Sequence, residues 1–108
     1  IKLAKVTGAV VMLKNNLSRI AMPGFEPVES GPGSTQLATA GTGDVLAGMI
    51  GALGAKAVSL GYELTQGRFA EIAIIANQLH SEAAEIAAAR GEFGATSVCR
   101  AISEAVNA

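Results

Sequence analysis

Residues 31–55 read GPGSTQLATAGTGDVLAGMIGALGA, a loop rich in Gly, Ser and Thr that runs directly into an apolar segment. We expect a helix from Asp44 to about Ala55, and its residues are apolar or small on every side, which is typical of a helix buried all round. Gly48, Gly51 and Gly54 each cost roughly 1 kcal/mol of helix propensity, so they indicate close approach of neighbouring backbones. The sequence therefore predicts an α/β fold in which helices pack closely against a sheet.

Three strands are expected before this loop. Residues 9–13 (AVVML) are apolar and β-branched at their centre, which predicts a strand covered on both faces, as parallel α/β sheets require. Asn15-Asn16 predicts a tight hairpin turn, because Asn tolerates positive φ. Residues 17–22 (LSRIAM) are then the return strand, and residues 26–30 (EPVES) form a short edge strand.

Two helices are expected after it. A long amphipathic helix ending at Arg90-Gly91 is predicted by apolar residues at three- and four-residue spacing: Phe69, Ile72, Ala73, Ala76, Leu79, His80, Ala83 and Ile86. His80 lies on this apolar stripe, where a hydrogen-bonded core histidine is the usual finding. Thr96 or Ser97 is expected to cap a final short helix, whose apolar stripe is Val98, Ile102 and Val106.

Length and charge restrict the possible functions. The 108 residues carry eight Lys and Arg against nine Asp and Glu, a net charge of −1, which predicts one domain with no electrostatic footprint for nucleic acid or an anionic membrane. The single Cys99 excludes an internal disulfide and favours a reducing compartment, the cytoplasm. We expect neither a membrane span nor a signal peptide, and the start at Ile1 without Met indicates a processed or excised piece.

The chemistry is expected at Gly41-Thr42-Gly43-Asp44. Two glycines let several backbone N–H groups converge, and the helix N-terminus adds about half a positive charge, so this point favours an anion such as phosphate. A dinucleotide fingerprint would need Gly at position 46, which is Leu46, and a P-loop would need Gly-Lys-Ser/Thr, which is absent.

A carboxylate would repel a resting phosphate, so we expect Asp44 to act as general base on a hydroxyl that attacks phosphorus. The alternative is that Asp44 is an ordinary helix N-cap. The apolar helix that follows favours the catalytic role, because it is expected to keep solvent scarce there, where an unneeded carboxylate would be costly.

Residues 37–50 (LATAGTGDVLAGMI) closely resemble the signature of the ADP- or ATP-dependent NAD(P)H-hydrate dehydratases, a family of the ribokinase-like superfamily. Residues 10–14 (VVMLK) also resemble a strand of that family, and Leu79-His80 with the later glycines resembles its C-terminal helices. The resemblance implies a ribokinase-like layered sheet with helices. Residues 1–108 would be the C-terminal portion of one such domain and hold the nucleotide-binding half of its site.

The family's reaction restores NADH or NADPH from the hydrated cofactor, after a phosphoryl group from ADP or ATP has activated the hydrate's hydroxyl. By resemblance, Asp44 is the base, and the nucleotide-binding residues are Lys14, Asn15, Asn16, Leu17, Ser18, Gly41, Thr42 and Gly43. The sequence departs from the family pattern at Asn15, where Gly is usual, and at Ser34-Thr35-Gln36, where many members have Asn-Pro-Gly.

The reaction also implies Mg²⁺, for which no protein ligand set is visible in the sequence, and a homo-oligomer is expected. Two alternatives stay open at this point. One is a small-molecule kinase of the same superfamily that acts on a sugar or vitamin-precursor alcohol. The other is a non-catalytic fragment that only binds nucleotide or self-associates.

Overall fold

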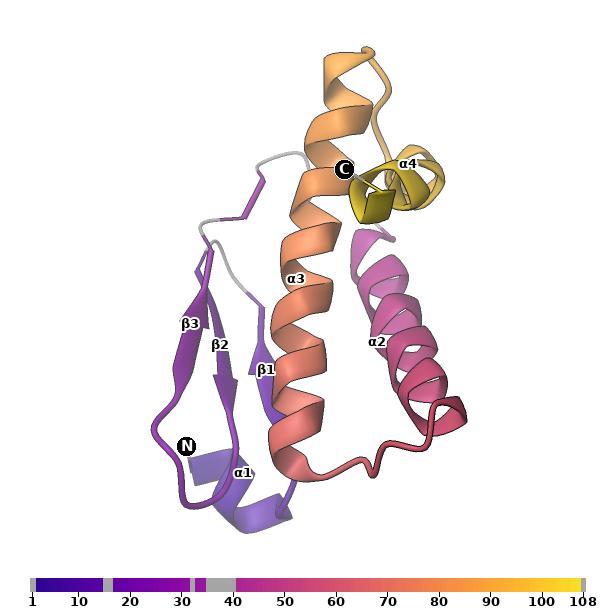
Figure 1. Ribbon diagram of the computed structural model, residues 1–108. Helices are drawn as coiled ribbons and strands as arrows, with labels where there is room; N and C mark the ends of the chain where they lie inside the picture. Colours follow the sequence, from indigo (N-terminus) through magenta and orange to yellow (C-terminus); the bar gives the residue numbers. More distant parts are fainter. Residues whose placement is uncertain (1, 15–16, 32, 35–40, 108) are drawn as a thin grey trace.

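The computed structural model describes residues 2–14, 17–31, 33–34 and 41–107, which form a small sheet, a long helix against it and a further helical layer beyond (Figure 1). In chain order the elements are α1 (Lys2–Thr7), β1 (Val11–Leu13), β2 (Ser18–Ala21), β3 (Val28–Ser30), α2 (Thr42–Ser59), α3 (Gln66–Ala89) and α4 (Ala95–Asn107). None of these helices is both long enough and apolar enough to cross a membrane. The expected turn at Asn15-Asn16 lies outside the described residues.

The three predicted strands are present, with shorter bounds, in an antiparallel sheet of order β1-β2-β3. Met12 pairs with Ile20, and Ile20 pairs with Val28. Only one face of the sheet is covered by α3, and Leu13 remains 66% exposed, so the predicted cover on both faces of the first strand is wrong. The reason is the short connection between β1 and β2, which allows only antiparallel pairing and leaves no crossover helix for the other face.

The central element is α3, which contacts the sheet on one side and both α2 and α4 on the other (Figure 1). It starts three residues before the expected Phe69, because the Thr65 hydroxyl accepts a hydrogen bond from the Arg68 amide at 3.1 Å and caps the helix. Its predicted apolar stripe is confirmed from Ile72 onward, with Ala76 and Ala83 fully buried.

The apolar helix α2 is longer than expected and is not buried all round. Its buried residues are Thr42, Leu46, Met49 and Gly54, whereas Gly48 and Gly51 are exposed. A Cβ added at either exposed glycine would meet nothing within 4 Å, so the predicted close backbone approach is wrong there. The physical reason is that α2 lies in the outermost layer, where α3 and α4 cover one side of it only.

The last helix, α4, lies across the upper ends of α2 and α3 (Figure 1). It begins at Ala95, after Gly94 with φ +103°, so neither Thr96 nor Ser97 is its cap. Val98 is buried as expected, but Val106 is 58% exposed. The interface between α3 and α4 is built from small side chains, which are Ala83, Ala84, Ala87, Val98, Ala101 and Ala105.

Candidate functional site

The first turn of α2 carries the predicted phosphate-binding residues. Gly41 is the N-cap residue, with φ 91° and ψ −13°, and no side chain forms a capping hydrogen bond. Thr42 is 3% exposed, while Gly43 and Asp44 are exposed. This turn therefore lies at the positive end of the helix dipole, and its Gly43 and Asp44 face solvent.

Asp44 is not an N-cap residue, because it lies within the first turn of the helix, and that alternative is wrong. Its exposure also overturns the expectation that solvent is scarce around it. The carboxylate forms no hydrogen bond or ion pair with any of the described residues. An exposed carboxylate of this kind is available to accept a proton from a bound molecule.

Gly41 is held against the start of α4. A Cβ at Gly41 would lie 3.1 Å from the Ala95 Cβ, which is closer than most real Cβ contacts. The positive φ and this contact both favour glycine at the position. Sequence reasoning missed the contact, since the 53 residues between the two positions carry no local signal that they meet.

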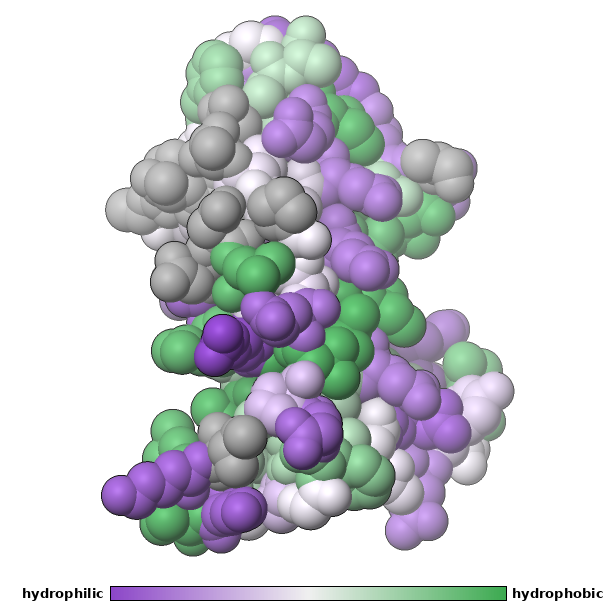
Figure 2. Space-filling view, turned by 90° about the vertical axis from the view of Figure 1, so that its left-hand side faces the viewer, coloured by the Kyte–Doolittle hydropathy of each residue, from purple (hydrophilic) through white to green (hydrophobic). Residues whose placement is uncertain are grey.

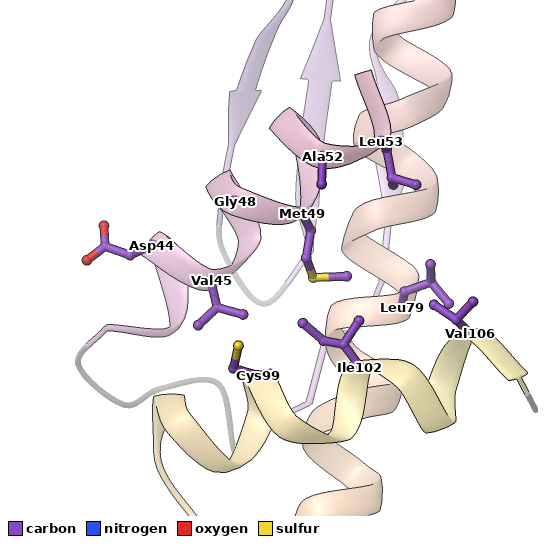
Figure 3. Close-up of a pocket in the computed structure, with 10 residues that line it drawn as sticks. All are labelled: Asp44, Val45, Gly48, Met49, Ala52, Leu53, Leu79, Cys99, Ile102 and Val106. Atoms are coloured by element: carbon purple, nitrogen blue, oxygen red, sulfur yellow. The ribbon is translucent and has the colours of Figure 1, made fainter. Parts of the chain in front are cut away.

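An apolar pocket of about 550 Å³ opens beside the same turn, between α2, α3 and α4. Figure 3 shows Met49, Leu79 and Ile102 pointing into it, whereas Asp44 stands at its rim with the carboxylate directed away from them. The pocket is also lined by Cys99, whose thiol is free, and its interior holds no charged side chain apart from Asp44 at the rim. It can therefore accept a flat or apolar group placed next to the first turn of α2.

The predicted residues at the first hairpin divide into two groups. Lys14 and Leu17 are exposed at the top of the sheet, whereas Ser18 is 3% exposed and lies inside the protein. Asn15 and Asn16 lie outside the described residues. Of this group, Lys14 is thus the residue whose charge is presented to solvent beside the end of β1.

His80 is a fully buried titratable residue of α3. The residue is 0% exposed, as the apolar stripe predicts, but neither ring nitrogen completes a hydrogen bond with the described residues. Burial lowers the pKa of His80 below 6.5, the charge of Lys14 lowers this pKa further, and the Thr42 backbone raises it. The neutral imidazole is therefore favoured in the folded protein.

Two of the predicted groups are of the kind that attract phosphate, namely the exposed Lys14 after β1 and the N-terminus of α2. In the described ranges, no three His, Cys, Asp or Glu side chains come together in a way that could hold a metal ion.

Comparison with known sequences identifies a family. The sequence model of a family described as NAD(P)H-hydrate dehydratase matches residues 2–107. The bifunctional NAD(P)H-hydrate repair enzyme Nnr of Mycobacterium leprae is 44% identical over 88 residues, which are 82% of this chain and 17% of that enzyme. An enzyme of the same name from Mycobacterium tuberculosis is 48% identical over 60 residues, which are 56% of this chain and 13% of the relative.

The ADP-dependent (S)-NAD(P)H-hydrate dehydratase of Neisseria meningitidis is 44% identical over 57 residues, which are 53% of this chain and 19% of that protein. The chain therefore spans less than a fifth of the length of each of these relatives. No solved structure matches the chain significantly.

Proposed function

The chain belongs to the NAD(P)H-hydrate dehydratase family, and we propose that it supplies the nucleotide-binding half of an enzyme that restores NADH or NADPH from the hydrated cofactor. In this reaction a phosphoryl group passes from an adenine nucleotide to the hydrate's hydroxyl, and phosphate then leaves. The Neisseria relative is named as ADP-dependent, which favours ADP over ATP as the donor.

The observation that carries the proposal is the exposed first turn of α2, which Gly41 begins and which carries Asp44, in a chain matched by the family model over residues 2–107. The Lys14 ammonium and the backbone at Thr42 and Gly43 would neutralise the charge of the nucleotide's phosphates and hold the transferred group in place. Leu17, Ser18 and the two asparagines before them would contribute further contacts near the end of β1.

Asp44 would accept the proton of the attacking hydroxyl. As the hydroxyl oxygen bonds to phosphorus, the bond from phosphorus to the nucleotide's leaving oxygen breaks, and the hydroxyl proton passes to the Asp44 carboxylate. The exposure of Asp44 and its lack of partners among the described residues support this role.

Magnesium has no protein site of its own in the described ranges. Mg²⁺ in nucleotide-dependent enzymes keeps several waters and is held largely by the phosphates, with one or two carboxylates. We assign it no step, because Asp44 is the single carboxylate in the first turn of α2.

The described residues would be the C-terminal portion of one ribokinase-like domain in the cytoplasm. Two observations support the proposal that these residues are one portion of a larger domain: the chain covers 17% of the Mycobacterium leprae relative, and one face of α2 is uncovered at its exposed glycines. A homo-oligomer is also proposed, because large apolar side chains are exposed on the strands and their loops, including Leu13, Phe25 and Val28. Apolar patches lie between charged residues on this side of the molecule (Figure 2). Light scattering would test the association.

The proposed function is tested by Asp44→Asn in the enzyme that contains this chain. Turnover of hydrated NADH with ADP should fall by on the order of 10²–10⁴, whereas the affinity for ADP should change little. Recovery of absorbance at the reduced nicotinamide band measures turnover. Glu85→Gln, a change at an exposed carboxylate of α3, is the matched control and should leave turnover unchanged.

Unchanged turnover in the Asp44→Asn enzyme would remove Asp44 from the mechanism. Failure of the unmodified enzyme to restore NADH would instead argue for a kinase of the same superfamily or a non-catalytic fragment. Phosphorylation of an alcohol substrate by the same preparation would then identify the kinase.

A further inference from the structure

The first turns of α2 and α4 are built alike and lie against each other. Each helix begins after a glycine with positive φ, which is 91° at Gly41 and 103° at Gly94. The Gly41 carbonyl accepts a hydrogen bond from the Val45 amide at 3.3 Å, and the Gly94 carbonyl accepts one from the Val98 amide at 3.1 Å. A Cβ at Gly41 would lie 3.1 Å from the Ala95 Cβ. The backbone that enters α2 is therefore in close contact with the first residue of α4.

A second contact holds the α2 turn at its other end. Val45 packs against the hydrophobic cluster that includes Val98 and Ala101 of α4. Figure 3 shows the Val45 side chain pointing from α2 toward α4. The residues at both ends of this turn, Gly41 and Val45, therefore rest on α4.

The residues between these two contacts divide into an inner and an outer set. Thr42 is buried, whereas Gly43 and Asp44 are exposed, and a Cβ added at Gly43 would meet nothing within 4 Å. No side chain forms a capping hydrogen bond at the start of α2. The turn is thus held from its inner side and presents Gly43 and Asp44 outward, so its direction depends on the contacts beneath it.

Ala95 is the contact whose size is most restricted. The space between its methyl group and Gly41 is too small for a further carbon atom, since a Cβ there would be closer than most real Cβ contacts. A larger side chain at position 95 must displace Gly41, and a hydrogen atom in place of the methyl would leave Gly41 room to move. A displacement of about 1 Å at a group that binds or reacts can lower a rate by about 10²-fold.

We propose that Ala95 is a positioning residue, whose methyl group fixes the backbone of Gly41 and thereby holds the Gly43 amide toward the phosphates of the bound nucleotide and Asp44 toward the attacking hydroxyl. This inference rests on the proposed nucleotide site. Ala95 touches neither the nucleotide nor the hydrate, and it acts through the turn that begins at Gly41.

Two substitutions of Ala95 in the enzyme that contains this chain test the proposal. Ala95→Val adds two methyl groups beside Gly41 and should weaken ADP binding, measured by titration calorimetry, by about tenfold, which corresponds to roughly 1.4 kcal/mol. Ala95→Gly removes the contact without adding an atom and should weaken ADP binding by about threefold, because a less preorganised turn binds less tightly. An ADP affinity that stays unchanged in either variant would overturn the proposal.

Ala105→Val is the matched control. Ala105 is buried in the same interface between α3 and α4, but it lies about 15 Å further along α4 than Ala95. This variant should also lower the free energy of unfolding, because it overpacks the interface, and it should leave the ADP affinity within about twofold. Equal losses of ADP affinity in Ala95→Val and Ala105→Val would show that Ala95 is only a structural residue, and would overturn the proposal.

A spectroscopic measurement on the unmodified enzyme decides the matter even if Ala95→Val does not fold. The methyl signal of Ala95 should shift when ADP binds, because the nucleotide and this methyl group act on the same turn, whereas the methyl signal of Ala105 should not. An Ala95 signal that ADP leaves in place would overturn the proposal.

The same measurements separate this proposal from the proposed function. An enzyme that binds ADP but does not restore NADH would refute the proposed reaction, while the ADP affinities of the variants would still judge Ala95. An enzyme that does not bind ADP would refute both.

Discussion

A substitution at Gly41 tests what fixes the backbone at the start of α2, because two independent constraints act on this residue. Its backbone lies in the left-handed region at φ 91°, and a Cβ there would come within 3.1 Å of the Ala95 Cβ on α4. Gly41→Ala therefore introduces both backbone strain and a collision with a side chain that has no freedom to rotate away.

The cost of this substitution can be worked out from the two constraints. Left-handed backbone costs an L-residue about 1–2 kcal/mol, and overpacking costs about 1–3 kcal/mol. The lower entropy of the unfolded chain returns about 0.4–1 kcal/mol. At the central values of these ranges the free energy of unfolding should fall by about 3 kcal/mol, equivalent to a melting temperature lower by about 15 °C for a chain of this size.

Urea unfolding of four proteins separates the two contributions: the unmodified chain, Gly41→Ala, Ala95→Gly and the double variant. Removing the Ala95 methyl should relieve the collision but leave the backbone strain, which gives a coupling free energy of about 1 kcal/mol. Gly43→Ala is the control, because its Cβ would meet nothing within 4 Å and its φ is not positive. A Gly41→Ala protein as stable as the unmodified chain, or an absence of coupling, would refute the reasoning.

Three further predictions concern stability. The pKa of His80 is below 6.5 in the folded protein, so the unfolded chain binds a proton at His80 at a higher pH than the folded protein does. The stability that His80 contributes should therefore be complete above about pH 6.5 and be lost as the pH falls toward the lowered pKa. Denaturation curves of the unmodified protein and of His80→Asn, recorded at several pH values, should diverge only in this pH range. Ser30→Ala and Asn77→Ala should each lower the free energy of unfolding, measured by chemical denaturation, by about 1–3 kcal/mol. The double variant should lose less than the sum of the two single losses, because both substitutions remove the same buried hydrogen bond. Strictly additive losses would contradict this prediction. Gly48→Ala and Gly51→Ala should each raise the free energy of unfolding by up to about 1 kcal/mol, because each added methyl meets open space on a helix; a loss of stability would show that this face of α2 is covered.

The local sequence predicted which elements form, because each carried a strong local signal. The three strands, the apolar helix, the long amphipathic helix and the final helix are confirmed, although their bounds differ by several residues. The short helix α1 was not predicted, since its six residues include two lysines and no periodic apolar stripe. The prediction that α2 is buried on all sides was wrong, because an apolar composition shows that a helix can be buried but does not show which elements pack against it.

The candidate site was predicted in part. Membership of the hydrate dehydratase family, indicated by residues 37–50, is confirmed by the match over residues 2–107. The roles of Asp44, Lys14 and their neighbours stay predictions. The prediction that solvent is scarce around Asp44 was wrong, because the exposure of this side chain depends on the position of α2 in the outermost layer. The lack of a hydrogen bond from the buried His80 ring to the described residues was not predictable, since it depends on how elements distant in sequence pack around the ring.

The alanine interface between α3 and α4 has a consequence for how the protein can change over evolutionary time. Small side chains set the distance between these two helices, and the first residue of α4 is the one that limits the backbone at Gly41. A larger residue at Ala101 would push the helices apart and shift Ala95 along with them. Natural variation at Ala101 should therefore be restricted by the backbone conformation that is required at Gly41, a position 60 residues earlier in the sequence.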